Sequence, residues 1–159
     1  FTECLQDPFF LAYGELGLDR VRKENWDQQI NVLEKQLDLI TQNQKPLVLH
    51  CVRAVSDLAF YFKKYKITSP LIFHHCGEDS SVQSFFKSDV YFSFSFKQIA
   101  KMSLAKLTSY SLDRIFFETD DEECAIEEVY DEYVKRTGIE KEKLQSQINS
   151  NFQKVFNGY

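Results

Sequence analysis

The chain has 159 residues, of which 43% are hydrophobic and 27% are charged, and its formal net charge is −5. These values are typical of a folded globular protein, and no apolar run approaches the roughly 20 residues that a membrane span needs. The acidic balance and the lack of a basic block argue against nucleic-acid binding mainly through the protein's own cations, so metal ions would have to supply much of the positive charge at such a site.

The first predicted elements alternate between strand and helix. Residues 8–19 (PFFLAYGELGLD) predict a buried strand that ends in a glycine-bearing turn. Residues 25–42 predict an amphipathic helix, because their apolar residues recur at steps of three and four. The run PLVLH at 46–50 predicts a second strand, and the apolar stripe over 55–65 predicts a second helix.

The same alternation continues through the rest of the chain. PLIFH at 70–74 predicts a third strand, and Ser80 or Ser81 can cap a short helix after it. VYFSFSF at 90–96 alternates phenylalanine with small or polar residues, as a strand would. DRIFFETD at 113–120 predicts a fifth strand, which is followed by two helices.

Continuous apolar strands that alternate with helices predict a parallel sheet covered by helices. His50 and His74 end two similar runs 24 residues apart (74 − 50), a repeat that suits a (β/α) barrel better than a Rossmann half. The sequence contains neither a GxGxxG nor a Walker loop. We therefore predict an α/β fold, a TIM-type (β/α) barrel, with a single domain over residues 1–159.

Polar side chains that could bind a metal follow the predicted strands. His50, His74 and His75 lie at strand ends, as do Glu15 and Asp120. Because the carboxyl ends of parallel strands meet at one rim, these side chains are expected to converge. Imidazoles and carboxylates suit Zn²⁺, Mn²⁺ or Mg²⁺. Such an ion would activate a water molecule, and one carboxylate could take its proton.

Each of these residues also has a purely structural interpretation. A single histidine at a strand end is more often hydrogen-bonded within the fold than bound to a metal. Glu15 could be a turn acid, and the acidic run at 118–123 could cap the next helix. The coincidence of every histidine and two acids at the same point of the repeat favours the metal site.

The cysteines contain no paired motif. They are scattered along the chain at Cys4, Cys51, Cys76 and Cys124. Without a CxxC pair, neither a zinc knuckle nor a redox motif is indicated. We therefore expect reduced thiols and a cytoplasmic protein.

Four sequence motifs resemble the TatD family of metal-dependent hydrolases. They are GELGLD (14–19), KPLVLHCVRA (45–54), PLIFH (70–74) and LDRIFFETDD (112–121), in the family's order and at about its spacing. The similarity extends from about residue 9 to the end of the chain. Because this family belongs to the amidohydrolase-like barrels, the resemblance implies a TIM-type barrel of that class.

The resemblance also implies roles for individual residues. Glu15, His50, His74 and Asp120 correspond to the family's ligands for one or two divalent ions, which could be Mg²⁺, Mn²⁺ or Zn²⁺. Asp120 and Glu15 would also be catalytic, with Asp120 as the candidate base. We prefer His74 over His75 as the ligand, because His74 repeats the register of His50.

Arg53 and His75 are the residues expected to contact substrate. Arg53 resembles the arginine that follows the family's histidine, although it stands three residues on, where many members have two. The implied activity is hydrolysis of phosphodiester bonds in DNA, in the manner of a 3′-exonuclease. Hydrolysis of an ester or C–N bond in a small molecule is an alternative, and a non-catalytic relative is another.

The front of the sequence departs from the family. Family members begin with a strand that carries an HxH pair, followed by a second strand, before the motif at 14–19. Neither strand is found in this sequence. Either the sequence given omits an N-terminal stretch or the protein is a truncated relative of the family. In both cases we expect the barrel of this segment to lack its first two β/α units and two of its ligands.

Overall fold

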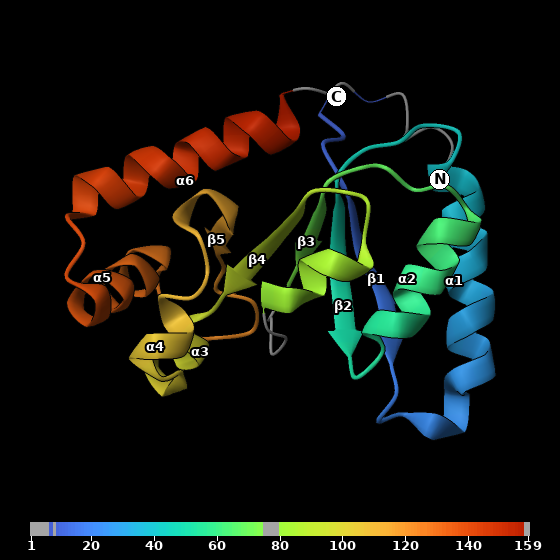
Figure 1. Cartoon of the computed structure of the whole chain (residues 1–159), viewed down its shortest axis with the longest axis horizontal. Coiled ribbons are helices and arrows are strands. Elements are labelled where there is room, and N and C mark those ends of the chain that lie inside the picture. Colours follow the sequence, from blue (N-terminus) through green and yellow to red (C-terminus); the bar gives the residue numbers. More distant parts are fainter. Residues whose placement is uncertain (1–6, 8, 75–79, 158–159) are drawn as a thin grey trace. The chain divides into compact units, whose positions relative to one another are not determined.

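The computed structural model describes residue 7, residues 9–74 and residues 80–157. Five strands follow one another in the sheet in the order β1-β2-β3-β4-β5, which is also their order along the chain (Figure 1). The chain divides into two compact units. The first unit runs up to Phe73 and includes Ser81–Val90, and the second begins at His74 and continues from Tyr91.

Three strands build the sheet of the first unit. They are β1 (Tyr13–Asp19), β2 (Leu47–Val52) and β3 (Leu71–Phe73). β1 pairs with β2 and β2 with β3, and both pairs are parallel. Leu18 and Leu49 on these strands are fully buried. The strand predicted over 8–19 begins only at Tyr13. Its first hydrogen bond to the neighbouring strand runs from the Tyr13 amide to the carbonyl oxygen of Pro46, just before β2.

Two helices pack against these strands. α1 (Trp26–Ile40) follows a short 3₁₀ turn, η2 (Lys23–Asn25), and α2 (Val55–Lys64) follows β2. Each helix turns an apolar stripe toward the sheet, as its spacing predicts. The buried members of these stripes are Leu33, Leu37, Ile40, Leu58 and Phe62. Figure 1 shows α1 and α2 next to each other, beside β1 and β2.

The second unit contains the last two strands. β4 (Val90–Phe94) pairs in parallel with β5 (Ile115–Phe117). All five residues of β4 are buried, and even Ser93 is only 4% exposed. The alternation of phenylalanine and serine therefore does not separate a buried face from a solvated one, because parallel strands are covered on both faces.

Helices and short turns surround the strands of the second unit. Those between β4 and β5 are α3 (Phe96–Lys101), α4 (Leu104–Leu107) and η4 (Leu112–Arg114). α5 (Ile126–Thr137) and α6 (Lys141–Phe156) follow β5. A further 3₁₀ turn, η3 (Ser80–Phe85), precedes β4 and belongs, apart from Ser80, to the first unit. No helix among the described residues is both long enough and apolar enough to cross a membrane.

A cap at Ser95 ends the run of β4. The side chain of Gln98 accepts a hydrogen bond from the Ser95 amide at 3.1 Å. The Ser95 hydroxyl donates to the Glu122 carboxylate at 2.6 Å. Since these bonds start a helix at Phe96, the predicted strand over 90–96 stops at Phe94.

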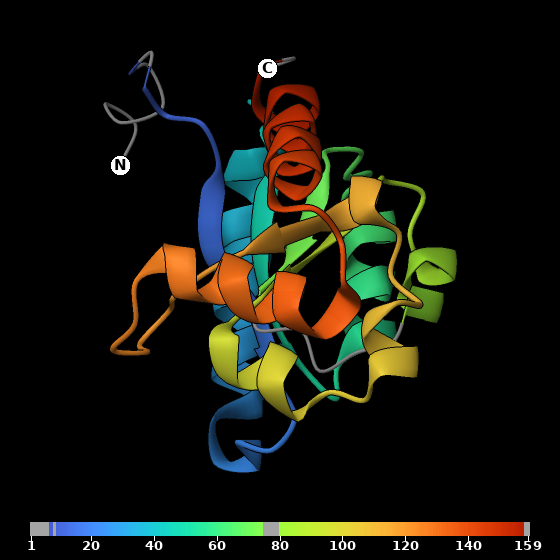
Figure 2. The same cartoon turned by 90° about the vertical axis from the view of Figure 1, so that its left-hand side faces the viewer.

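A buried asparagine fastens α6 to the second unit. Asn151 is 2% exposed, and its amide nitrogen donates to the carbonyl oxygens of Leu112 at 2.8 Å and Ile115 at 2.9 Å. Figure 2 shows α6 running above β5 and α5. The two bonds join the helix to the start of β5.

Candidate metal centre

Three of the predicted ligands come together. Glu15, His50 and His74 each offer one ligand atom, and these atoms all lie within 4.8 Å of one another. Glu15 belongs to β1 and His50 to β2, and His74 directly follows β3. Because these strands are neighbours in the sheet, one side chain from each is enough to build the cluster.

An irregularity in β1 sets the position of Glu15. Tyr13 pairs with Leu47 and Leu16 pairs with Leu49, so a three-residue step on β1 faces a two-residue step on β2. Such a bulge bends a strand and redirects a side chain. Glu15 lies inside this step, after a cis peptide bond. The bulge therefore fixes where the carboxylate of the predicted ligand points.

Gly17 allows β1 to approach β2 closely beside the second ligand. It stands opposite His50 in the strand register. A Cβ atom at Gly17 would lie 1.8 Å from the carbonyl oxygen of His50, and its φ of +153° is one that other residues rarely adopt. The GELGLD motif therefore carries a conformational requirement as well as a carboxylate.

Glu118 holds the ring of His74. The Nδ1 atom of His74 lies 3.2 Å from Oε1 of Glu118, and the two side chains are 9% and 17% exposed. A carboxylate in this place can accept the Nδ1–H bond, so that Nε2 carries the lone pair a cation needs. Glu118 stands in the motif LDRIFFETDD, but the sequence predicts no ligand or catalytic role for it. Its only signal is its place directly after the fifth strand.

The other predicted site residues lie on loops. Asp120 follows β5 with a φ of 50°, and Arg53 follows β2 with a φ of 52°. Both are exposed. Left-handed backbone is uncommon for residues other than glycine. The roles of Asp120 and Arg53 stay predictions, and His75 lies outside the described residues.

A pocket opens beyond the ends of β1 and β2. Its volume is about 450 Å³, and Arg20, Lys23, Trp26 and Arg53 line it. Arg53 is thus the predicted phosphate contact that borders a cavity. The motifs do not single out the other three lining residues as site residues, although Arg20 directly follows GELGLD and Lys23 and Trp26 stand shortly after it.

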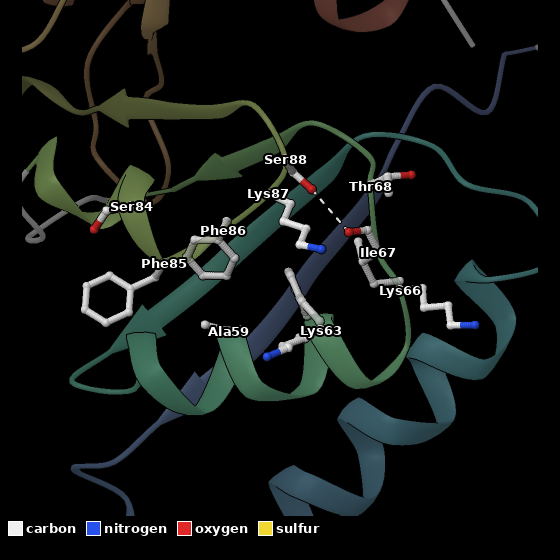
Figure 3. Close-up of a pocket in the computed structure, with 11 residues that line it drawn as sticks. Ala59, Lys63, Lys66, Ile67, Thr68, Ser84, Phe85, Phe86, Lys87 and Ser88 are labelled. Atoms are coloured by element: carbon white, nitrogen blue, oxygen red, sulfur yellow. Dashed lines mark hydrogen bonds between the residues drawn. The ribbon is translucent and has the colours of Figure 1, made fainter.

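A second pocket of the first unit, of about 410 Å³, lies at the other end of the strands. Ile67 and Thr68, which line it, precede β3, and Ser88 precedes β4. The Ser88 hydroxyl donates to the Ile67 carbonyl at 3.3 Å, and the side chains of Lys63 and Lys87 lie around the opening (Figure 3). None of Glu15, His50 and His74 lines this pocket, so it is separate from the candidate metal centre.

Comparisons with known proteins identify one family. The family model described as TatD related DNase matches residues 1–157. The chain is 33% identical over 127 residues to the human protein named 3'-5' RNA nuclease TATDN2. This match covers 74% of the chain and 17% of the human protein, so the chain spans about a sixth of the length of that relative.

Solved structures of family members share the fold. YjjV, a TatD homolog from Escherichia coli, superimposes with a TM-score of 0.80 at 18% identity, covering 98% of this chain and 68% of that chain. A TatD family hydrolase from Entamoeba histolytica gives a TM-score of 0.78 at 14% identity, covering 92% and 63%. The predicted α/β fold of the TIM-barrel class is confirmed.

Proposed function

The chain belongs to the TatD related DNase family, and from this premise we propose that it is a metal-dependent hydrolase of phosphodiester bonds. We propose single-stranded nucleic acid as the substrate, shortened from its 3′ end. The observation that carries the proposal is the cluster of Glu15, His50 and His74, whose ligand atoms lie within 4.8 Å of one another.

The cluster fits a divalent cation by its donor set. One carboxylate and two imidazoles are suitable ligands for Zn²⁺ or Mn²⁺, and the carboxylate is also a suitable ligand for Mg²⁺. Protein ligands lie about 2.0–2.2 Å from such an ion, so the three atoms, now within 4.8 Å of one another, would have to move closer together to share it. We assign Glu15, His50, His74 and Asp120 to hold one or two ions.

The roles of the chain's own residues follow from this assignment. A bound ion would lower the pKa of a water molecule and neutralise charge on the phosphate. Glu118 orients His74 through its Nδ1 atom, at 3.2 Å. We propose that Asp120, assisted by Glu15, takes the proton from the attacking water. Arg53 is proposed to pair with the substrate phosphate.

DNA is the substrate we expect first, and RNA is its competitor. The family description names a DNase, whereas the human relative is named as an RNA nuclease. Both substrates present the same phosphodiester linkage to the proposed ligands, so the cluster itself does not choose between them. The cytoplasmic location stays a prediction from the sequence.

The test follows the length of 5′-labelled single-stranded DNA and RNA 20-mers incubated with the protein and Mg²⁺ or Mn²⁺. We expect a ladder that shortens from the 3′ end, with at least about a 100-fold loss of rate for Asp120→Asn and for His50→Ala. Glu127→Gln, a change of an exposed acid on α5, is the control. Wild-type rates in both site variants would overturn the assignment, and internal cleavage would overturn the exonuclease mode.

A further inference from the structure

We propose that the pocket lined by Arg20, Lys23, Trp26 and Arg53 binds one unpaired nucleotide of a single-stranded nucleic acid. The base would stack on the surface formed by Trp26 and Arg20, and the phosphate would lie between Lys23 and Arg53. This inference rests on the proposed function, because it places part of the same substrate next to the candidate metal centre.

The pocket lies just beyond the strands that carry two of the ligands. Asp19 and Val52 form the last pair of the β1–β2 ladder, and the Arg20 amide donates to the Val52 carbonyl at 2.9 Å. Arg20 and Arg53 therefore follow the two strand ends directly. His50 stands three positions before Arg53 on the same strand and loop (53 − 50). A strand of nucleic acid whose phosphate reaches the cluster would pass this pocket.

The guanidinium of Arg20 is fixed in place. It makes two hydrogen bonds to the carboxylate of Asp57, at 2.7 and 2.5 Å. Its central carbon also lies 4.5 Å from the centre of the Trp26 ring. Bases of single-stranded nucleic acids stack on aromatic rings and on guanidinium planes. Because the surface is already ordered, little side-chain entropy is lost when a base stacks on it.

Two further cations face the pocket. Neither Lys23 nor Arg53 forms an ion pair with any residue in the described ranges 9–74 and 80–157. In a chain of net charge −5, two cations beside one cavity attract an anion to this place. Arg53 is also held with a φ of 52°, and unusual backbone of this kind clusters at ligand contacts.

The dimensions and chemistry suit a nucleotide rather than a duplex. A pocket of about 450 Å³ falls in the range of small-ligand sites, roughly 300–1,000 Å³. A stacking surface needs a base whose face is open, which paired bases inside a helix lack. The combination of a ring, a guanidinium plane and two cations therefore indicates an unpaired nucleotide within a single strand.

Trp26 is the one tryptophan of the chain, so its fluorescence reports on this pocket alone. The protein is titrated in EDTA with a thymidine 10-mer, a uridine 10-mer and an abasic 10-mer of the same charge. We expect the base-containing strands to quench the fluorescence and the abasic strand to leave it unchanged. Equal quenching by the abasic strand, or no quenching at all, would overturn the inference.

Affinity measured with a labelled thymidine 10-mer gives a second readout. We expect Trp26→Leu to weaken binding about 5- to 150-fold and Trp26→Phe to restore most of it, because phenylalanine keeps an aromatic face. Lys23→Gln should weaken binding and reduce its salt dependence, whereas Lys35→Gln, an exposed lysine on α1, should do neither. Thermal unfolding checks that each variant folds.

The titration in EDTA separates the two proposals. Base-dependent quenching together with no cleavage in the presence of Mg²⁺ or Mn²⁺ would retain the nucleotide pocket and reject the hydrolase. Cleavage of single strands with no effect of Trp26→Leu on affinity would retain the hydrolase and reject the pocket.

Discussion

The Nδ1 atom of His74 lies 3.2 Å from Oε1 of Glu118. This contact joins a histidine that follows β3 to a glutamate that follows β5. A histidine whose Nδ1–H is bound to a carboxylate keeps one ring orientation and one tautomer. The contact therefore prepares His74 to act as a ligand before any cation arrives.

Replacing Glu118 with glutamine is expected to lower cation affinity about 10- to 100-fold. The amide keeps the shape of the side chain but removes the negative charge that supports the His74 ring. Titration calorimetry with Mn²⁺ measures the effect. Glu123→Gln, a change of an exposed acid in the same loop, is the matched control. Equal affinities of the Glu118 variant and the wild type would show that the contact does not support metal binding.

Replacing Gly17 with alanine should destabilise the protein by at least about 2 kcal/mol. The new Cβ would lie 1.8 Å from the carbonyl oxygen of His50, so β1 and β2 would have to separate. Gly138→Ala is the matched control, because that glycine also has a positive φ, +72°, but its Cβ would meet nothing within 4 Å. Urea denaturation compares them, and equal losses would contradict the close approach.

Replacing Asn151 with alanine is expected to lower the free energy of unfolding by about 2–3 kcal/mol. The change removes the amide nitrogen that donates to the carbonyl oxygens of Leu112 and Ile115. Both oxygens then lose this hydrogen bond. Ser150→Ala, on the exposed side of α6, should change stability by less than about 0.5 kcal/mol. Denaturant unfolding tests both, and a neutral Asn151 variant would contradict the role of this residue.

Acid should weaken the ion pair between Glu34 on α1 and Lys64 on α2. The hydrogen bond from Lys64 holds the pKa of Glu34 below its ordinary value of 4.5. Because the folded pKa is the lower one, this contribution to stability is complete above pH 4.5 and is lost as the pH falls through the folded value. The stability difference between the wild type and Glu34→Gln should therefore shrink from about pH 6 to about pH 3.5.

The partner of that pair provides the control. Lys64→Gln removes the same hydrogen bond from the other side, so it should show the same pH-dependent difference. Urea unfolding at the two pH values measures both variants. A difference that stays constant with pH would show that the pair does not stabilise the fold.

Cation binding should stabilise the folded protein. The proposed ligands come from β1, from β2 and from the end of β3, so an ion held by them links three neighbouring strands. At a concentration 100 times the dissociation constant, the expected gain is about 2.7 kcal/mol. Thermal unfolding with Mn²⁺ and after EDTA measures it. His50→Ala should lose most of the gain, and an unchanged shift would place the ion elsewhere.

The sequence predicts the family, the fold class and the order of strands and helices, because apolar periodicity and short motifs are local properties. It does not predict where β1 begins. Phe9 and Phe10 belong to an apolar run, yet Phe9 is 88% exposed and the strand starts at Tyr13. Pairing with a distant segment decides this boundary, and a single run of residues carries no information about that partner.

In the candidate site, too, the sequence predicts the residues of local motifs but not the contacts between distant segments. The motifs identify Glu15, His50 and His74, and the structure brings their ligand atoms together. They do not reveal that Glu118 orients His74, since that contact joins residues 44 positions apart (118 − 74). The ligand roles of Glu15, His50, His74 and Asp120 stay predictions, as does the single domain over 1–159.

Because Gly17 has no Cβ atom, it has a consequence for comparing the sequences of related proteins. A homologous sequence that carries a larger residue here cannot keep the same spacing between its first two strands of this segment. The residues that correspond to Glu15 and His50 would then lie at a different distance from each other, even if both are present in that sequence. The glycine therefore marks the close spacing of the two strands, which the glutamate two positions before it does not reveal.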